Sequence, residues 1–153
     1  MNITAYFYKG KHRYSLFFLD WLRNLFPTRL KAKKIKVEFM IHESCWYLDP
    51  QEPGQINKLF GFSSWLIHRN SWRLGWKPNP YHEPFEKSFL LYSYIYQNGK
   101  RYEQLLKIVN ANVWHTVYIP EYELHTRLVW HCFPYFGGKL PAPNNCFIKI
   151  RYD

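Results

Sequence analysis

The dipeptide Asn98-Gly99 is the feature that most constrains the fold of this chain, because it separates two runs rich in apolar and aromatic residues. Asn-Gly in such a setting favours a two-residue turn whose twist suits antiparallel strands. We therefore predict a β-hairpin in which Gln97 and Lys100 flank the turn. The predicted cross-strand pairs are Tyr96 with Arg101, Ile95 with Tyr102, Tyr94 with Glu103, Leu91 with Leu106 and Phe89 with Ile108.

This register divides the hairpin between two faces, since successive side chains of a strand point to opposite sides. One face is predicted to be core and carries Phe89, Leu91, Ile95, Tyr102, Leu106 and Ile108. The other face carries a row of three tyrosines beside two charged residues: Tyr92, Tyr94, Tyr96, Arg101 and Glu103. Phenol rings with charged neighbours are too amphipathic for ordinary core, so we interpret the row as a recognition surface.

Short alternating runs separated by turn residues fill most of the remaining chain. They predict strands over residues 3–8, 35–42, 62–68, 72–77, 114–119, 127–133 and 146–152. Aromatic residues make up 21% of the sequence, and they suit a pleated surface. Without alternating strands and helices or a fixed repeat, the pattern predicts one all-β domain over residues 1–153, an antiparallel β-sandwich or jelly roll.

Residues 15–26 differ from the rest because their apolar side chains recur close to helical spacing and Pro27 ends the pattern. We predict a short helix here and interpret it as packed over the end of the sandwich. The basic stretch that follows leaves a second interpretation open, an amphipathic element that lies on a membrane surface.

The net charge of +10 is concentrated near the N-terminus, in residues 9–36, which hold nine Lys or Arg residues and a single acid, Asp20. Such a patch attracts phosphate, an anionic membrane or an acidic protein. A solvated strand edge protected by lysines is the alternative interpretation. The residues predicted to form the basic patch are Arg29, Lys31, Lys33, Lys34 and Lys36.

Cysteine usage and the absence of targeting patterns bear on location. The three cysteines show no CxxC spacing, which is typical of reduced core thiols in a cytosolic protein, although one disulfide with a spare thiol is an alternative. The N-terminus lacks a secretory signal pattern, and no apolar run reaches the roughly 18 residues that span a bilayer. We expect a cytoplasmic protein without a transmembrane segment, or alternatively a component of a virion.

The stretch from Leu59 to Lys77 combines three tryptophans with several polar side chains. Polar groups buried among tryptophans need hydrogen-bond partners, so they indicate either an internal polar network or a ligand site. His68 and Arg73 of this stretch are candidate ligand contacts.

Catalytic and metal-binding patterns are weak. The histidines are scattered, and no pair with a third ligand has the spacing of a zinc site. Glu121 and Glu123 lie in a segment with loop character, which does not favour the paired carboxylates of a glycosidase. Ser71 lies near His68 without an acid to orient the histidine. We therefore predict no metal, no cofactor and a non-enzymatic role.

Several phrases from residue 57 to residue 145 carry a resemblance to a group of known proteins. NKLFGF, HRNSWRLGW, YQNGKR and FPYFGGKLPAPNN, in this order, resemble small β-sandwich proteins of bacterial and phage genomes with a jelly-roll or concanavalin-like character. The resemblance covers the C-terminal two-thirds of the chain. It implies a fold and no activity, because such sandwiches serve many functions.

Three binding functions follow from these features. The first is glycan recognition by an aromatic and basic sheet face, with Tyr92, Tyr94, Tyr96, Arg73, His68 and Arg101 as ligand contacts. The second is assembly, in which the aromatic face is covered by another subunit, as in a jelly-roll component of a phage particle. The third is nucleic-acid or anionic-surface binding through the basic N-terminal segment. We predict glycan recognition ahead of the other two.

Overall fold

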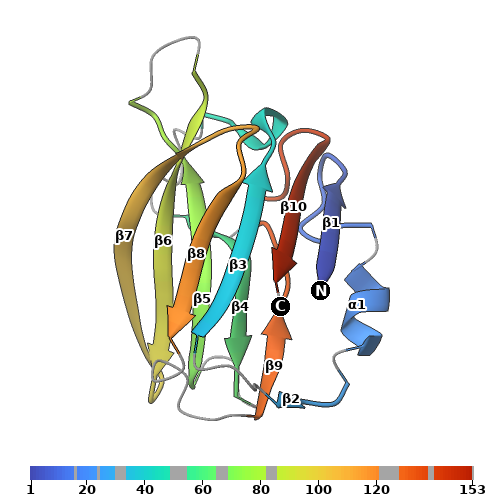
Figure 1. Ribbon diagram of the computed structural model, residues 1–153. Helices are drawn as coiled ribbons and strands as arrows, with labels where there is room; N and C mark the ends of the chain where they lie inside the picture. The colour runs from blue at the N-terminus through green and yellow to red at the C-terminus, as the bar shows by residue number, and fades with distance from the viewer. Residues whose placement is uncertain are drawn as a thin grey trace.

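The protein is a β-sandwich of two antiparallel sheets (Figure 1). The structure is a computed structural model that describes residues 1–15, 17–23, 25–29, 34–48, 55–64, 69–81, 86–120, 128–137 and 140–152. In strand order, one sheet contains β1 (Asn2–Phe7), β10 (Cys146–Tyr152), β3 (Lys34–Ile41) and β8 (His115–Pro120). The other contains β2 (Thr28–Arg29), β9 (Leu128–Cys132), β4 (Asn57–Ser63), β5 (Ser71–Pro78), β6 (Ser88–Gln97) and β7 (Lys100–Asn110).

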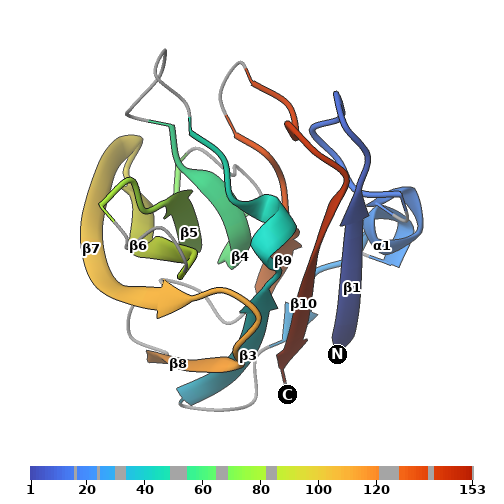
Figure 2. The ribbon, with the colours of Figure 1, turned by 90° about the horizontal axis from the view of Figure 1, so that it is seen from above.

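The core lies between the two sheets, which face each other as layers when the molecule is seen from above (Figure 2). Alternation in the sequence builds it, because every second residue of a strand turns inward. In β3 the buried residues are Ile35, Val37, Phe39 and Ile41, and in β10 they are Cys146, Ile148, Ile150 and Tyr152. The prediction of an all-β sandwich is thereby confirmed.

Aromatic rings join the two layers. The ring centroid of Tyr152, in β10, lies 4.4 Å from that of Phe60, in β4. Phe136 packs edge-on against Phe7 of β1 at 4.9 Å and against Trp76 of β5 at 5.5 Å. Aromatic side chains therefore supply much of the area that holds the sheets together.

The predicted hairpin is present, and its turn is the type expected for Asn-Gly. Asn98 has φ 51° and Gly99 has φ 79°, so both central residues are left-handed, as a type I′ turn requires. The turn is held against the preceding β4–β5 connection, since Asn98 N donates to Asn70 Oδ1 at 3.0 Å and Gly99 N donates to the Arg69 carbonyl at 3.0 Å. The near half of the predicted register is confirmed: Tyr96 pairs with Arg101, Ile95 with Tyr102 and Tyr94 with Glu103.

The far half of the predicted register is wrong by one residue. A bulge between Tyr92 and Leu91 inserts an extra residue into β7, so that Leu91 pairs with Lys107 and Phe89 pairs with Val109. Val109 is buried in consequence, in place of the predicted Ile108.

Three residues predicted to be core are instead exposed, by 42 to 58%: Tyr102, Leu106 and Ile108. For Leu106 and Ile108 the reason is the bulge, which leaves Leu106 as the extra residue of β7 and sets Ile108 opposite Leu90, on the outer face of the sheet. Tyr102 stays on the inward side, opposite Ile95, and it is exposed because β7 is the edge strand of the wider sheet. In Figure 1 this strand lies beyond β8, which is the corresponding edge of the four-stranded sheet. The inward face of an edge strand that overhangs the opposite layer meets solvent.

Within the predicted helical range 15–26, the structure describes a helix, α1, over Phe17–Arg23. Four of its apolar side chains are 40 to 63% exposed: Phe18, Leu19, Trp21 and Leu22. They therefore do not form the packed face that we predicted. The reason is placement, because α1 lies beside the edge strand β1 and not over the end of the sandwich (Figures 1 and 2). A one-turn helix, η1 (Glu43–Cys45), follows β3.

All three cysteines are free and buried.

Candidate ligand-binding face

The outer face of the six-stranded sheet gathers tyrosines and cations from β4 to β7. Tyr92, Tyr94 and Tyr96 point away from the core, because Leu91 and the inward side chains of β5 turn toward it. In β5, Ser71 pairs with Tyr96 and Arg73 with Tyr94, which sets these side chains on the same outer face. We call this set the tyrosine face: Lys58, Arg73, Lys77, Tyr92, Tyr94, Tyr96 and Arg101.

Tyr94 is the centre of the tyrosine face, since three cationic groups surround its ring. Arg101 Cζ lies 4.6 Å from the ring centroid, Arg73 Cζ lies 5.3 Å away and Lys58 Nζ lies 5.5 Å away. Such distances are within the range of cation–π attraction. Tyr94 itself is only 4% exposed, and Arg73 is equally buried. These two residues form the floor of the site.

A glycine in β4 makes room for Arg73. Gly61 pairs with Arg73 across the sheet, and a Cβ on Gly61 would lie 2.9 Å from Arg73 Cγ and 2.3 Å from the carbonyl oxygen of Trp72. The Arg73 side chain can therefore lie flat on the sheet, where Arg73 Nε donates to Ser71 Oγ at 3.2 Å. Its guanidinium also lies 5.5 Å from the ring centroid of Tyr96.

The rim of the tyrosine face is more accessible than its floor. Tyr92 and Tyr96 are half-buried, and Lys77 Nζ lies 5.0 Å from the centroid of the Tyr92 ring. The rings of Tyr94 and Tyr96 meet edge to face at 84°, and the Tyr94 hydroxyl donates to the Tyr96 hydroxyl at 3.4 Å. Burial raises the pKa of Tyr94, and the Tyr96 hydroxyl adds to the effect, so the phenol of Tyr94 is a neutral hydrogen-bonding group near pH 7.

The electrostatics of this face are those of closely spaced positive charges. Burial lowers the pKa of Lys58 to about 8, and the charges of Arg73 and Arg101 act in the same direction. Burial and the charge of Arg101 also lower the pKa of Lys77. Glu103 forms an ion pair with Arg101, and it is the one carboxylate that the described part of strands β4 to β7 contributes here.

The structure brings together five of the six predicted ligand contacts, namely Arg73, Tyr92, Tyr94, Tyr96 and Arg101. His68, the sixth, lies outside the described residues. Two members of the tyrosine face were not predicted. Lys77 shares a face with Arg73 by simple alternation, so the signal for it was present in the sequence. Lys58 gave no such signal, because a bulge between Lys58 and Phe60 turns it outward.

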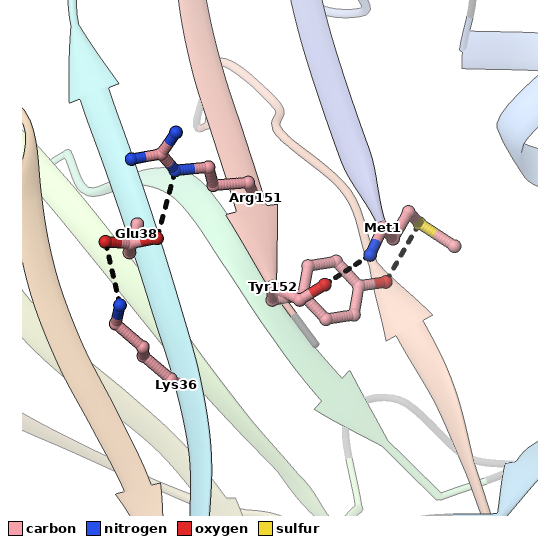
Figure 3. Close-up of polar contacts among 5 residues, drawn as sticks. All are labelled: Met1, Lys36, Glu38, Arg151 and Tyr152. Carbon is pink, nitrogen blue, oxygen red and sulfur yellow. Dashed lines mark hydrogen bonds and ion pairs between the residues drawn. The ribbon is translucent and has the colours of Figure 1, made fainter.

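The described members of the predicted basic patch, Arg29, Lys34 and Lys36, do not belong to the tyrosine face. Lys36 lies in β3 of the opposite sheet, where Figure 3 shows Glu38 between Lys36 and Arg151, each with a nitrogen-to-oxygen distance of 3.0 Å. The hydrogen bond from Lys36 and the neighbouring charges lower the pKa of Glu38. Arg29 lies in the two-residue strand β2, and Lys34 begins β3. Lys31 and Lys33 lie outside the described residues.

His131 is the most perturbed histidine in the described part of the chain. It lies among core aromatic rings, where the Tyr152 hydroxyl contacts Nδ1 at 2.8 Å and Thr28 Oγ1 lies 3.1 Å from Nε2. Burial and the nearby amino group of Met1 lower the pKa of His131 to about 4. Figure 3 shows Met1 beside Tyr152, whose hydroxyl donates to the Met1 sulfur at 2.9 Å. A neutral imidazole in this setting has a structural role.

Metal sites and membrane-spanning helices are not seen in the described part of the chain. Among the described residues, no three His, Cys, Asp or Glu side chains cluster so as to hold a metal ion. The helices of that same part of the chain are too short or too polar to cross a bilayer. The tyrosine face is therefore the cluster on which a functional argument can be built.

Comparisons with family models, with curated proteins and with solved structures give no match for this chain. The resemblance to small bacterial and phage sandwich proteins therefore stays a prediction. A function for this chain therefore rests on the chemistry of the tyrosine face.

Proposed function

We propose that this protein is a non-enzymatic glycan-binding module that recognises its ligand through the tyrosine face. The observation that supports the proposal is the placement of three tyrosines and three cations on adjacent strands of one outer sheet face, with Tyr94 at the centre. Sugar rings present both C–H surfaces and hydroxyls. Aromatic rings contact the former through their faces or their edges, and fixed hydrogen-bonding groups such as phenols and guanidinium groups bind the latter.

The accessible members of the face would make the direct contacts. Tyr92 and Tyr96 are half-buried, whereas Tyr94 is buried beneath the cations. We therefore assign sugar contact to Tyr92, Tyr96 and Arg101, and assign to Tyr94 and Arg73 the role of holding them in place. A rigid sheet lowers the entropic cost of binding, because the contacts are preorganised.

A glycan array probed with the purified protein tests the proposal. Tyr92→Ala and Tyr96→Ala are expected to weaken every array signal about tenfold or more, with the melting temperature nearly unchanged. Tyr118→Ala is the matched control, because Tyr118 is an exposed tyrosine of β8 in the other sheet. An array without signals, or signals that survive both substitutions, would remove the proposal.

Assembly into a larger particle is a second candidate, favoured by the exposed strand β7. In the described part of the chain β7 pairs with β6 alone and leaves its other edge open. Its exposed apolar side chains include Leu105 and Ile108. Open edges are templates for pairing with another chain. Sedimentation velocity over a hundredfold range of concentration tests this candidate: a constant monomer rejects self-assembly, and oligomers abolished by Leu105→Lys with Ile108→Lys support it.

A further inference from the structure

We infer that the ligand of the tyrosine face is an acidic glycan, and that its carboxylate or sulfate group binds between Lys58 and Arg101. This inference rests on the proposed function and specifies the ligand class for the same site. It draws on the charges of the face, whereas the proposed function draws on the tyrosine rings.

Several cations converge on the rings of Tyr94 and Tyr92. Lys58, Arg73 and Arg101 come from three different strands, β4, β5 and β7, yet each lies within 5.5 Å of the Tyr94 ring centroid. Lys77, over the neighbouring Tyr92 ring, is a fourth. Arg73 is buried in the floor of the site, whereas Lys58 and Arg101 reach its surface, so two neighbouring cations of the tyrosine face are placed to receive one anion.

Burial and the positive charges of the tyrosine face lower the pKa values of its lysines. Lys58 and Lys77 both have lowered pKa values, and in each case the charge of Arg101 contributes after burial. Burial is the larger cause, and the neighbouring positive charges disfavour the protonated lysines further. An anion bound beside Lys58 and Arg101 would oppose this effect and stabilise the protonated form of Lys58.

Two of these cations, Arg101 and Lys58, are accessible from solvent. The Arg101 side chain is 45% exposed, and Lys58 is half-buried, so both can meet a group that arrives from solvent. The ion pair between Arg101 and Glu103 uses one side of the guanidinium, which carries five N–H donors. A ligand carboxylate or sulfate can share this guanidinium with Glu103.

The covered tyrosine rings favour a sugar acid over nucleic-acid phosphate as the ligand. Single-stranded nucleic acid is bound by stacking bases on open aromatic faces. Here cations cover the ring faces of Tyr92 and Tyr94, and Tyr94 meets Tyr96 edge to face. The phenol hydroxyls of Tyr92 and Tyr96, which are both half-buried, suit sugar hydroxyls better than flat bases. We therefore assign the acid to a glycan.

The experiment compares probes that differ only in charge. Hexagalacturonate is measured by calorimetry against its fully methyl-esterified form, and a sulfated galactan hexasaccharide against its desulfated form. We expect at least one acidic probe to bind about tenfold or more tightly than its neutral partner, the gain typical of one charge-assisted hydrogen bond. Comparison of the two acidic probes shows whether carboxylate or sulfate is preferred.

Matched variants separate the site from the overall positive charge. Lys58→Met with Arg101→Gln removes two charges from the tyrosine face, and Lys9→Gln with Lys11→Gln removes two exposed charges elsewhere. The first pair is expected to abolish the preference for the acidic probe. The second is expected to leave the affinity within about twofold, since distant exposed charges are screened. The melting temperature of each variant reports whether it folds.

Each outcome decides between the two claims. Equal binding of acidic and neutral probes, or equal loss in both double variants, overturns the acidic-ligand inference and leaves glycan binding in place. Failure of all four probes, when the array gives signals for other sugars, overturns the inference alone, and an array without signals removes both. Tighter binding of a ten-residue oligothymidine, lost in Lys58→Met with Arg101→Gln, would assign the site to nucleic acid.

Discussion

Lys58 offers the sharpest test of the electrostatics of the tyrosine face, because its charge is predicted to cost stability. Its amine is half-buried, and burial together with Arg73 and Arg101 lowers its pKa from 10.5 to about 8. A group that is harder to protonate in the folded state than in the unfolded state destabilises the fold below its folded pKa. The wild-type protein should therefore gain stability as the pH rises from 8 to 10.5.

Lys58→Met removes this charge and keeps an unbranched side chain of similar length. The pKa difference corresponds to about 3 kcal/mol, which partial solvent exposure reduces to about 2 kcal/mol. The substitution also removes the hydrogen bond from Lys58 Nζ to the Ile56 carbonyl, 3.2 Å long, at a cost of about 1 kcal/mol. We expect the variant to be more stable than wild type by about 1 kcal/mol at pH 7.

Urea unfolding measures this difference without adding salt that would screen the charges. The advantage of Lys58→Met should shrink between pH 8 and pH 10.5, because wild-type Lys58 loses its proton over that interval. Lys87→Met is the control: Lys87 is exposed, and a change within about 0.5 kcal/mol at all pH values is expected. A variant that is less stable than wild type at pH 7, or a difference independent of pH, would refute the reasoning. If Lys58→Met is more stable than wild type, and Lys58→Met with Arg101→Gln loses the preference for the acidic probe, the site carries unfavourable charge that serves binding.

Three further predictions concern the fold. The pKa of His131 is lowered from 6.5 to about 4, so between these pH values the unfolded chain binds a proton at His131 and the folded chain does not. The free energy of unfolding should therefore fall by up to about 3 kcal/mol as the pH drops from 6.5 to 4. Urea titrations should show a smaller fall in His131→Gln, and an equal fall in both proteins would contradict the prediction. Gly61→Ala should cost about 1–3 kcal/mol and weaken glycan binding, because the added Cβ would lie 2.3 Å from a backbone oxygen; an unchanged urea midpoint would count against that geometry. The three free cysteines are buried, so a thiol reagent should modify none of them in the native protein and all three in urea, and rapid native labelling would show that the core is open.

Strand alternation and turn chemistry were readable from the sequence, because both are local properties. The buried sets of β3 and β10, the type I′ turn at Asn98-Gly99 and the first three pairs of its hairpin all depend on neighbours within a few residues. For the same reason the sequence placed the three tyrosines together on one face and assigned Arg101 to their side. It also put Arg73 in a candidate site without showing which strand lay next to it.

Properties that depend on contacts between distant segments were decided by the tertiary structure. The bulges beside Lys58 and Leu91 interrupt strict alternation, so alternation alone does not give the outward side of Lys58 and wrongly predicted that Ile108 is core. Whether an inward side chain is buried depends on what lies opposite, and only the unequal widths of the two sheets show that Tyr102 meets solvent. The cluster around Tyr94 requires β4, β5, β6 and β7 to be neighbours, a long-range order that no local pattern encodes.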